Sequence, residues 1–383
     1  MESPERTFGR PLDRIRVVEM SSVISGPYTG MMLADLGAEV VKVEMPGSGD
    51  VFRAWAGDKS AVSPPFAAFN RDKRSVAIDV READGAAQYL DLTASADVVF
   101  ENFRPGKLES LGVGLSAVVE RNPTVVYCAI SGMGSSGPLR DYPTYDAIAQ
   151  AMSGLWSQLT DMQDPESVGP PMCDQVASHY AVQGILSALF ARERSGQGTA
   201  IEISMLGAAL SFQSVSIANY LETGAVADTL DRAKRSQSYA FACADSKPLA
   251  IHLSTPDKFW KGLTSVIGRP DLYDDPRFRT KTDRIREYHT LRSVLAAEFT
   301  RAPRDTWLDE LRAVDVPCAP LNTIAEALEE PQAKHLGIVQ SFGSEERQMR
   351  LAGSPLHFSG VATPRRGPVP AVGEHDDLYL RKP

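Results

Sequence analysis

Apolar and polar residues follow two alternating patterns over the first 220 residues of the chain. Short runs rich in Val and Ile are typical of buried strands, and apolar residues spaced three and four apart are typical of helices. Near-continuous apolar strands separated by helices lie in parallel sheets covered on both faces, so the pattern predicts an α/β fold with a parallel sheet. The expected strands are 15–20, 40–43, 75–80, 96–100, 124–130 and 200–203, and the expected helices are 29–36, 84–94, 145–159, 178–192 and 204–221.

The texture of the sequence changes near residue 225, where charge density rises and helical spacing recurs at 258–267, 288–300 and 304–314. A length of 383 residues agrees with two or three domains. The expected organisation is a large α/β domain that begins at 11–224, a smaller α-rich second domain at 225–330, and a C-terminal segment at 331–383 that returns to the large domain.

Composition excludes several classes of protein. Apolar residues make up 43% and charged residues 23%, which excludes global disorder. Forty Lys and Arg residues against 49 Asp and Glu residues give a net charge of −9, so we expect neither a general nucleic-acid binder nor a membrane binder. No apolar stretch approaches the ~20 residues of a membrane span, and Met1–Arg10 lacks the apolar core of a signal peptide. We therefore expect a cytoplasmic protein.

Signals for a metal or redox centre are weak. The cysteines lie far apart and form no CxxC pair, so we expect scattered reduced thiols. The six histidines show no metal-ligand spacing, and the sequence contains no GxSxG, Walker A or HExxH motif. The cysteines are Cys128, Cys173, Cys243 and Cys318.

A formal GxGxxG motif, GMGSSG, follows a predicted strand at 132–137. A dinucleotide-binding motif requires a helix that opens within the glycines and an acidic residue after the next strand. Pro138 and Pro143 disfavour an immediate helix. We therefore interpret the segment as a glycine turn, either beside a ligand or simply a turn.

Asp174 has two interpretations. It ends the segment GPPMCD (169–174) at the start of a predicted apolar helix, where an aspartate commonly caps the helix and complements its dipole. A helix N-terminus also stabilises developing negative charge, so a catalytic carboxylate is the alternative.

Two basic loops flank predicted strands. Asn70–Ser75 precedes one strand, and Asn102–Lys107 follows another. Loops at the carboxyl ends of parallel strands line ligand crevices, and Asn, Arg and backbone amides there suit a phosphorylated ligand. Solvated loop charge is the alternative for each loop taken alone.

Several longer segments of the sequence resemble those of a known protein family. The run GPYTGMMLADLGAEVVKVEMPGSGD (26–50) resembles the opening signature of family III CoA-transferases, the formyl-CoA and carnitine-CoA transferase (CaiB/BaiF-like) type. The resemblance covers roughly Pro11 to Leu380. Later blocks in the expected order are NRDKRSVAIDV (70–80), ADVVFENFRPG (96–106), NPTVVYCAISGMGSSGPLRDYPTYDAIAQAMSG (122–154) and RERSGQGTAIEISM (192–205), with weaker matches at DPRF (275–278) and VPCAPLN (316–322).

The resemblance implies a fold, a partner and a reaction. The fold would be a Rossmann-like large domain plus a smaller second domain, and two subunits would form an interlocked homodimer. Asp174 stands where the family has its nucleophile, which would attack an acyl-CoA thioester to give an aspartyl anhydride and then an enzyme–CoA thioester. Coenzyme A would then pass to a carboxylic acid. The implied reaction needs no metal and no prosthetic group, and its site must exclude water.

The resemblance also implies a set of binding residues. Arg81 and Arg104 would meet phosphate groups of CoA, and Ser25 would lie near the thioester. Trp55 stands where the family has an active-site aromatic residue, and Arg53 is a candidate anchor for a substrate carboxylate. The implied CoA-binding residues are Ser25, Ile78, Asp79, Val80, Arg81, Asn102, Phe103, Arg104 and Tyr145, the last in the segment Pro143–Asp146.

Several positions depart from the family pattern. Met45 replaces a frequent basic CoA contact, Ile24 replaces a glutamine of oxalate-using members, and no glycine-rich loop is evident between 230 and 260. The departures leave the substrate pair open. The nearest alternative is the α-methylacyl-CoA racemase branch, whose catalytic histidine would fall at Tyr145. A non-catalytic acyl-CoA-binding protein and an NAD-dependent oxidoreductase are more distant alternatives.

Overall fold

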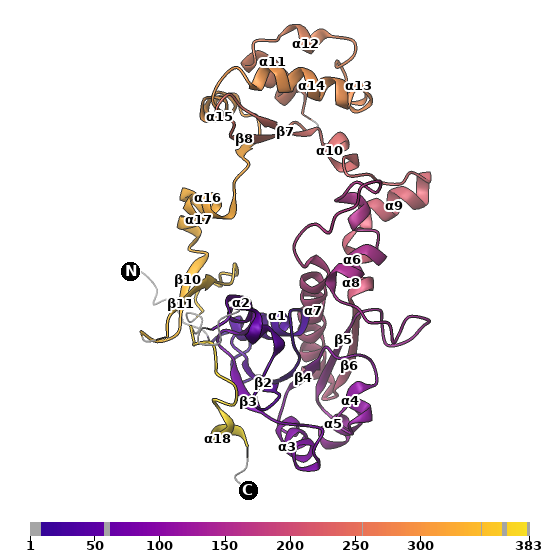
Figure 1. The fold of residues 1–383 in the computed structure, drawn as a ribbon, viewed down its shortest axis with the longest axis vertical. Coiled ribbons are helices and arrows are strands. Elements are labelled where there is room, and N and C mark those ends of the chain that lie inside the picture. Colours follow the sequence, from indigo (N-terminus) through magenta and orange to yellow (C-terminus); the bar gives the residue numbers. More distant parts are fainter. Residues whose placement is uncertain (1–8, 57–61, 255, 346, 362–365, 381–383) are drawn as a thin grey trace. The chain divides into compact units, whose positions relative to one another are not determined.

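A six-stranded parallel sheet forms the centre of the larger of two compact units (Figure 1). The computed structural model describes residues 9–56, 62–254, 256–345, 347–361 and 366–380. The strand order is β3-β2-β1-β4-β5-β6, and every neighbouring pair is parallel, which confirms the expected α/β fold. The strands are β1 (Arg16–Met20), β2 (Glu39–Glu44), β3 (Arg74–Ala77), β4 (Val98–Glu101), β5 (Val126–Ser131) and β6 (Thr199–Ser204).

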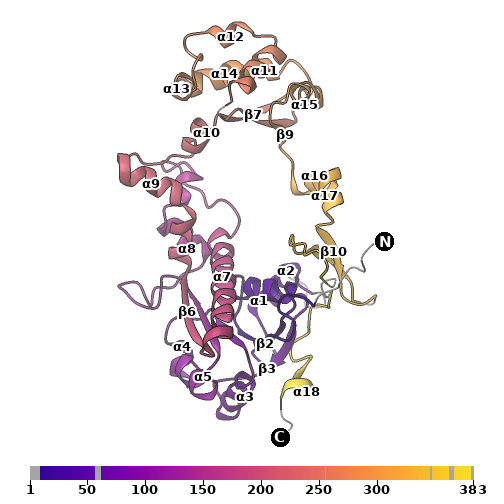
Figure 2. The same cartoon turned by 180° about the vertical axis from the view of Figure 1, so that it is seen from behind.

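Helices cover both faces of this sheet. Successive strand side chains point to opposite faces, so Phe100 packs in one core and Val99 in the other. The first core contains α1 (Ser25–Asp35), α7 (Met172–Ser195) and α8 (Met205–Phe212); the second contains α3 (Ala83–Thr93), α4 (Lys107–Ser110) and α5 (Leu115–Arg121). Helices α1 and α7 lie side by side in both views, and the Ser178 hydroxyl donates to the Ser25 carbonyl at 2.7 Å (Figures 1 and 2).

The order of the strands creates a crevice. The chain builds outward from β1 to β3 and then restarts on the other side of β1 with β4. The loops after β1 and β4 therefore leave the sheet in opposite directions. The crevice between two such loops is the place where open α/β sheets bind ligands. These loops are 21–24 and 102–106.

Four predicted helices differ from the observed ones. The helix expected at 29–36 is α1, which begins four residues earlier at Ser25. The helix expected at 145–159 ends as α6 (Asp146–Met152), because Gly154 adopts a left-handed φ of +77° and a 3₁₀ turn, η2 (Trp156–Gln158), follows. Helix α7 begins at Met172, six residues before the expected start at Ser178. The helix expected at 204–221 is divided at Gln213 into α8 and α9 (Ser214–Thr223).

The C-terminal segment lies along the β3 edge of the sheet. His375 donates its amide to the Ser75 carbonyl at 2.9 Å, and the Ala77 amide donates to Asp376 at 2.8 Å. Residues 337–383 belong to the same compact unit as the sheet. Its elements are the hairpin β10 (Val339–Phe342) and β11 (Met349–Ala352) and the helix α18 (Asp376–Tyr379); η1 (Val51–Ala56) and α2 (Pro64–Asn70) complete this unit.

The second compact unit comprises 157–166 and 219–336. Its boundaries fall six residues from the sequence-based changes at 224/225 and 330/331. Trp260, Phe278 and Phe299 are fully buried in its core. This unit contains a three-stranded antiparallel sheet, formed by β7 (Ser238–Ala242), β8 (Pro248–His252) and β9 (Cys318–Pro320). Helices pack with this sheet: α10 (Asp231–Ser236), α11 (Asp257–Val266), α12 (Asp271–Asp274), α13 (Lys281–Arg286), α14 (Tyr288–Phe299) and α15 (Arg304–Ala313). Two further helices follow, α16 (Ile324–Glu329) and α17 (Pro331–Leu336).

Two predictions from composition concern the whole chain. Within the described residues, no helix combines the length and apolar character needed to cross a membrane. All four cysteines are free thiols, as expected from their spacing.

Candidate active site

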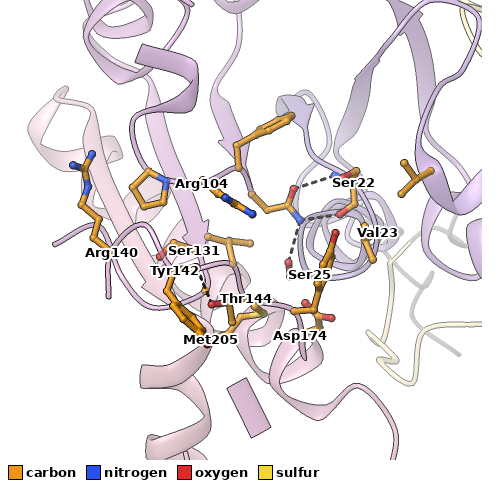
Figure 3. A pocket seen from close by; sticks show the side chains of 17 residues that line it. Ser22, Val23, Ser25, Arg104, Ser131, Arg140, Tyr142, Thr144, Asp174 and Met205 are labelled. Carbon is orange, nitrogen blue, oxygen red and sulfur yellow. Dashed lines mark hydrogen bonds between the residues drawn. The ribbon is translucent and has the colours of Figure 1, made fainter. Parts of the chain in front are cut away.

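Two adjoining cavities follow the crevice between the loops of β1 and β4. The first has a volume of about 290 Å³ and the second about 240 Å³, and they share Ser22, Val51 and Phe103 (Figure 3). We call them together the switch-point groove. The first is also lined by Val23, Ser25, Asn102, Arg104, Pro105, Ile130, Ser131, Gly132, Arg140, Tyr142, Thr144, Tyr145, Asp174 and Met205; the second by Met20, Ser21, Val43, Glu44, Met45, Gly49, Asp50, Ile78, Val80, Arg81, Lys107, Leu108 and Leu111.

Asp174 lies at one end of the first cavity and is only 8% exposed. Figure 3 shows Ser25 and Asp174 together at this end and Arg140 at the other. Burial raises the pKa of Asp174 to about 7, and the nearby charge of Asp146 raises it further, while hydrogen bonds from Ser25 oppose both effects. A carboxylate with this pKa is ionised in about half of the molecules at neutral pH.

The N-terminus of α7 is capped from another helix. Its N-cap residue, Pro171, has no side-chain acceptor. Instead, Oδ1 of Asp146 in α6 accepts the amides of Cys173 at 2.8 Å and Asp174 at 3.0 Å. Asp174 lies in the first turn of α7, where its charge complements the helix dipole as expected, but the interpretation that its side chain caps the helix is wrong, because Asp146 accepts the first-turn amides.

The N-terminus of α1 meets Asp174 directly. Ile24 is the N-cap residue and offers no polar side chain, so the first amides of this helix need an acceptor from elsewhere. Ser25, the first residue of this helix, lines the cavity beside Asp174, and its hydroxyl and amide favour the ionised carboxylate and so lower its pKa. Asn102, from the loop after β4, donates in turn to the Ser25 hydroxyl at 3.1 Å. The N-terminus of α1 and the polar groups of Ser25 thus favour the ionised form of Asp174, but burial and the charge of Asp146 outweigh them.

A buried cluster of charges lies beneath the loop after β1. Glu19 pairs with Lys42 at 2.9 Å and with Lys73 at 2.7 Å, and all three side chains are inaccessible to solvent. Arg71 is likewise buried and pairs with Asp35 at 2.5 Å. The expectation that the basic loop at 70–75 lines a phosphate site is therefore wrong, because its Arg71 and Lys73 side chains hold the core of the sheet together.

The structure brings most of the predicted CoA-binding residues to the switch-point groove. Ser25, Asn102, Arg104 and Tyr145 line the first cavity, Ile78, Val80 and Arg81 line the second, and Phe103 lines both. Asp79 lines neither cavity and pairs with Arg81 at 2.6 Å. Their roles in CoA binding remain predictions.

The two predicted substrate residues lie outside the lining of both cavities. Arg53 pairs with Glu44 at 2.6 Å, donates to the Pro370 carbonyl at 3.0 Å, and stacks over Phe66. Trp55 is 66% exposed and packs against Phe52 with ring centroids 4.4 Å apart. An anchoring role for Arg53 would require it to leave Glu44.

The glycine motif forms a turn. Gly134 and Gly137 adopt positive φ values of 107° and 86°, and the next helix, α6, begins only at Asp146. This confirms the turn and agrees with the absence of a dinucleotide-type helix after the motif. Gly132 lines the first cavity, so the turn lies beside the groove.

Sequence reasoning missed Arg140 and the capping role of Asp146. Arg140 lines the first cavity from the long loop after β5, and no ion pair to it is found among the described residues. The rule that loops at the carboxyl ends of parallel strands line the crevice could have indicated it. No cluster of three metal-ligating side chains occurs among the described residues.

Comparison with known proteins assigns the family. A family model described as CoA-transferase family III matches residues 12–376. The chain is 34% identical to acetyl-CoA:oxalate CoA-transferase of Acetobacter aceti, over 97% of this chain and 95% of that protein, and 31% identical to succinyl-CoA:glutarate CoA-transferase of Mus musculus, over 97% and 86%. A crystal structure of a CAIB/BAIF family protein from Brucella suis matches with a TM-score of 0.86 at 30% identity, covering 97% of this chain and 98% of that one.

The chain therefore belongs to CoA-transferase family III. It is an acyl-CoA:carboxylate CoA-transferase of that family.

Proposed function

We propose that this enzyme moves CoA from an acyl-CoA to a carboxylic acid with Asp174 as the covalent nucleophile. The observation that carries the proposal is the Asp174 carboxylate, buried in the switch-point groove beside Ser25 at the N-terminus of α1. The ionised carboxylate attacks the thioester carbonyl carbon, the C–S bond breaks, and CoA leaves as a thiolate. The products of this step are a mixed anhydride between Asp174 and the acyl group, and free thiolate.

The thiolate then attacks the aspartyl carbonyl, which releases the donor carboxylate and leaves CoA on Asp174 as a thioester. The acceptor carboxylate attacks this thioester, giving a second anhydride and thiolate, and the thiolate finally takes the acceptor acyl group. Asp174 is regenerated as a carboxylate, and no net proton is gained or lost. An anhydride keeps the energy of the thioester, whereas attack by water would lose it. The low exposure of Asp174 suits this requirement. These steps use no metal and no prosthetic group.

We propose that CoA lies along the switch-point groove with its thioester at Asp174. Ser25, Asn102, Phe103 and Tyr145 would contact the reacting end, while Arg81 would lie at the far end in the second cavity beside Ile78 and Val80. The groove offers cationic side chains for the phosphates of CoA at Arg81, Arg104, Lys107 and Arg140.

Arg140 provides a test of this placement. Replacing Arg140 with Ala is expected to raise KM for acyl-CoA about tenfold with kcat nearly unchanged, because a charge-assisted contact to a phosphate contributes to binding in ground and transition states alike. Arg121→Ala, at an arginine that pairs with Asp91 away from the groove, is the control and is expected to leave KM unchanged. Steady-state kinetics with CoA and dephospho-CoA thioesters measures the effect and identifies the phosphate. An unchanged KM with every thioester contradicts the placement.

The carboxylic acid partner is expected to be a dicarboxylic acid. The names of these relatives include oxalate and glutarate, each of which carries two carboxylates. This expectation rests on those names rather than on a residue of the groove, and a panel of mono- and dicarboxylic acids with one acyl-CoA donor tests it.

We propose further that the active form is an interlocked homodimer. Phe190, Phe212 and Val215 are each more than half exposed, and β6 is an edge strand of the sheet. Monomeric proteins seldom expose apolar side chains in this number on neighbouring helices, so a second copy is the proposed cover. Light scattering is expected to give twice the 41.6 kDa of one chain. We also propose a cytoplasmic location, with which the four free cysteines agree.

The charge of Asp146 is expected to set the pH dependence of the reaction. Only ionised Asp174 attacks, so kcat/KM should rise with pH through the pKa of about 7. Asp146→Asn retains an oxygen for the two amides but removes the negative charge, so the pKa of Asp174 falls and the acid limb moves to lower pH. The control is Asp91→Asn, far from the groove, which should leave the limb in place. A limb that stays in place in Asp146→Asn argues against Asp174 as the titrating group.

Covalent trapping tests the mechanism as a whole. The enzyme is incubated with a panel of acyl-CoAs, with and without hydroxylamine or borohydride, and analysed by intact mass and peptide mapping. An adduct on Asp174 that is absent in Asp174→Ala supports the proposal. Asp84→Asn is the matched control, because Asp84 also stands in the first turn of a helix, α3, but lies outside the groove. No adduct with any thioester, together with deuterium exchange at the acyl α-carbon, would overturn it in favour of a racemase.

A further inference from the structure

The turn that leads into α1 contains a strained residue. Val23 adopts a φ of +69°, in the left-handed region that β-branched residues avoid. The turn lies between the end of β1 and Ser25, and Val23 lines the first cavity. Strained residues persist only where the surrounding structure fixes them, and they gather at functional sites. The groups that fix this turn are therefore informative.

Two side chains from distant parts of the chain fix the turn. Oδ1 of Asp50 accepts the Val23 amide at 3.2 Å and the Phe52 amide at 3.0 Å. Asn102 accepts the Ser22 amide at 3.0 Å and donates to the Ser22 carbonyl at 2.8 Å. The bond from Asp50 is made to the strained residue itself.

Asp50 is in turn fixed from β2. Its Oδ2 lies 3.0 Å from the ammonium group of Lys42, and its amide donates to Glu44 at 2.9 Å. Asp50 is 4% exposed, and both carboxylate oxygens are engaged by protein groups. The carboxylate therefore has a structural task at the turn, although the residue also lines the second cavity.

We propose that Asp50 is a positioning residue that holds Val23 in its left-handed conformation and so keeps Ser25, at the N-terminus of α1, beside the Asp174 carboxylate. This rests on the proposed function, in which Asp174 is the nucleophile. Without Asp50, Val23 relaxes to negative φ, the first turn of α1 shifts, and Ser25 leaves the carboxylate. Asp50 acts on the reaction through Ser25 and not by contact with the reacting atoms.

A double-mutant cycle with Val23→Gly tests the proposal. Glycine adopts positive φ without penalty, so the turn of the Val23→Gly variant needs no anchor to stay in place. We expect Asp50→Ala to lower kcat about 30-fold with Val23 present but only about threefold in the Val23→Gly background. The two expected losses thus differ tenfold. A left-handed conformation costs a residue with a Cβ an amount that corresponds to roughly 5- to 30-fold, and the tenfold difference lies within that range. Equal losses in the two backgrounds would overturn the proposal, because a merely structural role of Asp50 does not depend on the residue at position 23.

The pH profile provides a second readout. Withdrawal of Ser25 from Asp174 raises the pKa of that carboxyl group, so the acid limb of kcat/KM should move to higher pH in Asp50→Ala and return in the double variant. Asp146 from α6 and Cys173 on α7 also face Asp174, and neither changes in the cycle. An unmoved limb in Asp50→Ala contradicts the proposal.

The cycle separates this inference from the proposed function. If Asp50→Ala does not fold, Asn102→Ala takes its place, since it removes the other anchor of the turn, and the same dependence on the residue at position 23 is expected. Full activity of Asp174→Ala would refute the nucleophile, whereas inactivity of that variant with additive losses at positions 50 and 23 would refute only the positioning role.

Discussion

Asp174→Asn is expected to lower kcat by on the order of 10⁴-fold or more, because a neutral amide cannot form the anhydride. The substitution keeps the size of the side chain, so substrate binding should change little. The measurement is the steady-state rate of CoA exchange between an acyl-CoA and an acid, followed by chromatography of the CoA esters. Asp174→Ala is measured in parallel, because slow deamidation of Asn would restore the aspartate.

Asp84→Asn again provides the comparison, with an expected rate within about twofold of the unaltered enzyme, as for most surface substitutions. Rates for both Asp174→Asn and Asp174→Ala within tenfold of the unaltered enzyme would remove Asp174 from the chemistry. The placement of CoA in the groove would survive that outcome, since Arg140→Ala tests it separately.

The same substitution is expected to stabilise the protein. Burial holds the pKa of Asp174 near 7 in the folded chain, whereas an unfolded aspartate titrates near 3.9. The unfolded state therefore releases the proton more readily, and the free energy of unfolding falls as pH rises between these two values and stays lower above them. Removing the carboxylate should remove this cost, on the order of 2–4 kcal/mol above pH 7. Thermal unfolding of both proteins at pH 4.5 and pH 8 measures the difference, which should be larger at pH 8.

The sheet could be predicted from the sequence because each strand has a local pattern of β-branched and apolar residues. Val40–Val43 and Thr124–Ile130 are β-branched runs, and each corresponds to an observed strand within a few residues. The cap of α7 could not be predicted in this way. Its acceptor, Asp146, lies 28 residues before Asp174, and the helix starts after two prolines without a capping side chain. Local capping rules therefore assigned to Asp174 a task that a distant residue performs.

The burial of the charged side chains in the loop at 70–75 likewise could not be predicted from neighbouring residues in the sequence. A lysine on a polar loop is usually solvated, and nothing around Lys73 in the sequence marks it as buried. Its partner, Glu19, lies in β1, and the pairing arises only when β1, β2 and β3 lie side by side in the sheet. The other loop, at 102–107, does line the crevice, because it follows the carboxyl end of β4, whereas the loop at 70–75 precedes β3.

Glu19 is the residue whose removal should cost the large unit most stability. It pairs with two lysines, and all three side chains are fully buried. Burial lowers the pKa of Lys73 to about 8, while the charge of Glu19 opposes this effect. Without Glu19, Lys73 has lost its only ion-pair partner among the described residues, and Lys42 retains Asp50. Breaking a buried pair in this way typically costs about 3–5 kcal/mol.

We therefore expect Glu19→Gln to lower the free energy of opening of β1 and β2 by about 3–5 kcal/mol. Native-state hydrogen exchange of the β1 and β2 amides is the suitable measurement, because it reports on this sheet separately from the second unit. Asp315→Asn provides the matched control, because it breaks an ion pair on the surface. The Lys258 side chain of that pair is 62% exposed and the Asp315 side chain 79%, so the substitution should cost at most about 1 kcal/mol. Equal effects of the two substitutions would show that the buried cluster is no more important than a surface pair. Replacing Glu19 and Lys73 together with Met, while Lys42 stays paired with Asp50, should recover much of the loss, because the cost arises from unpaired buried charge and not from the missing attraction.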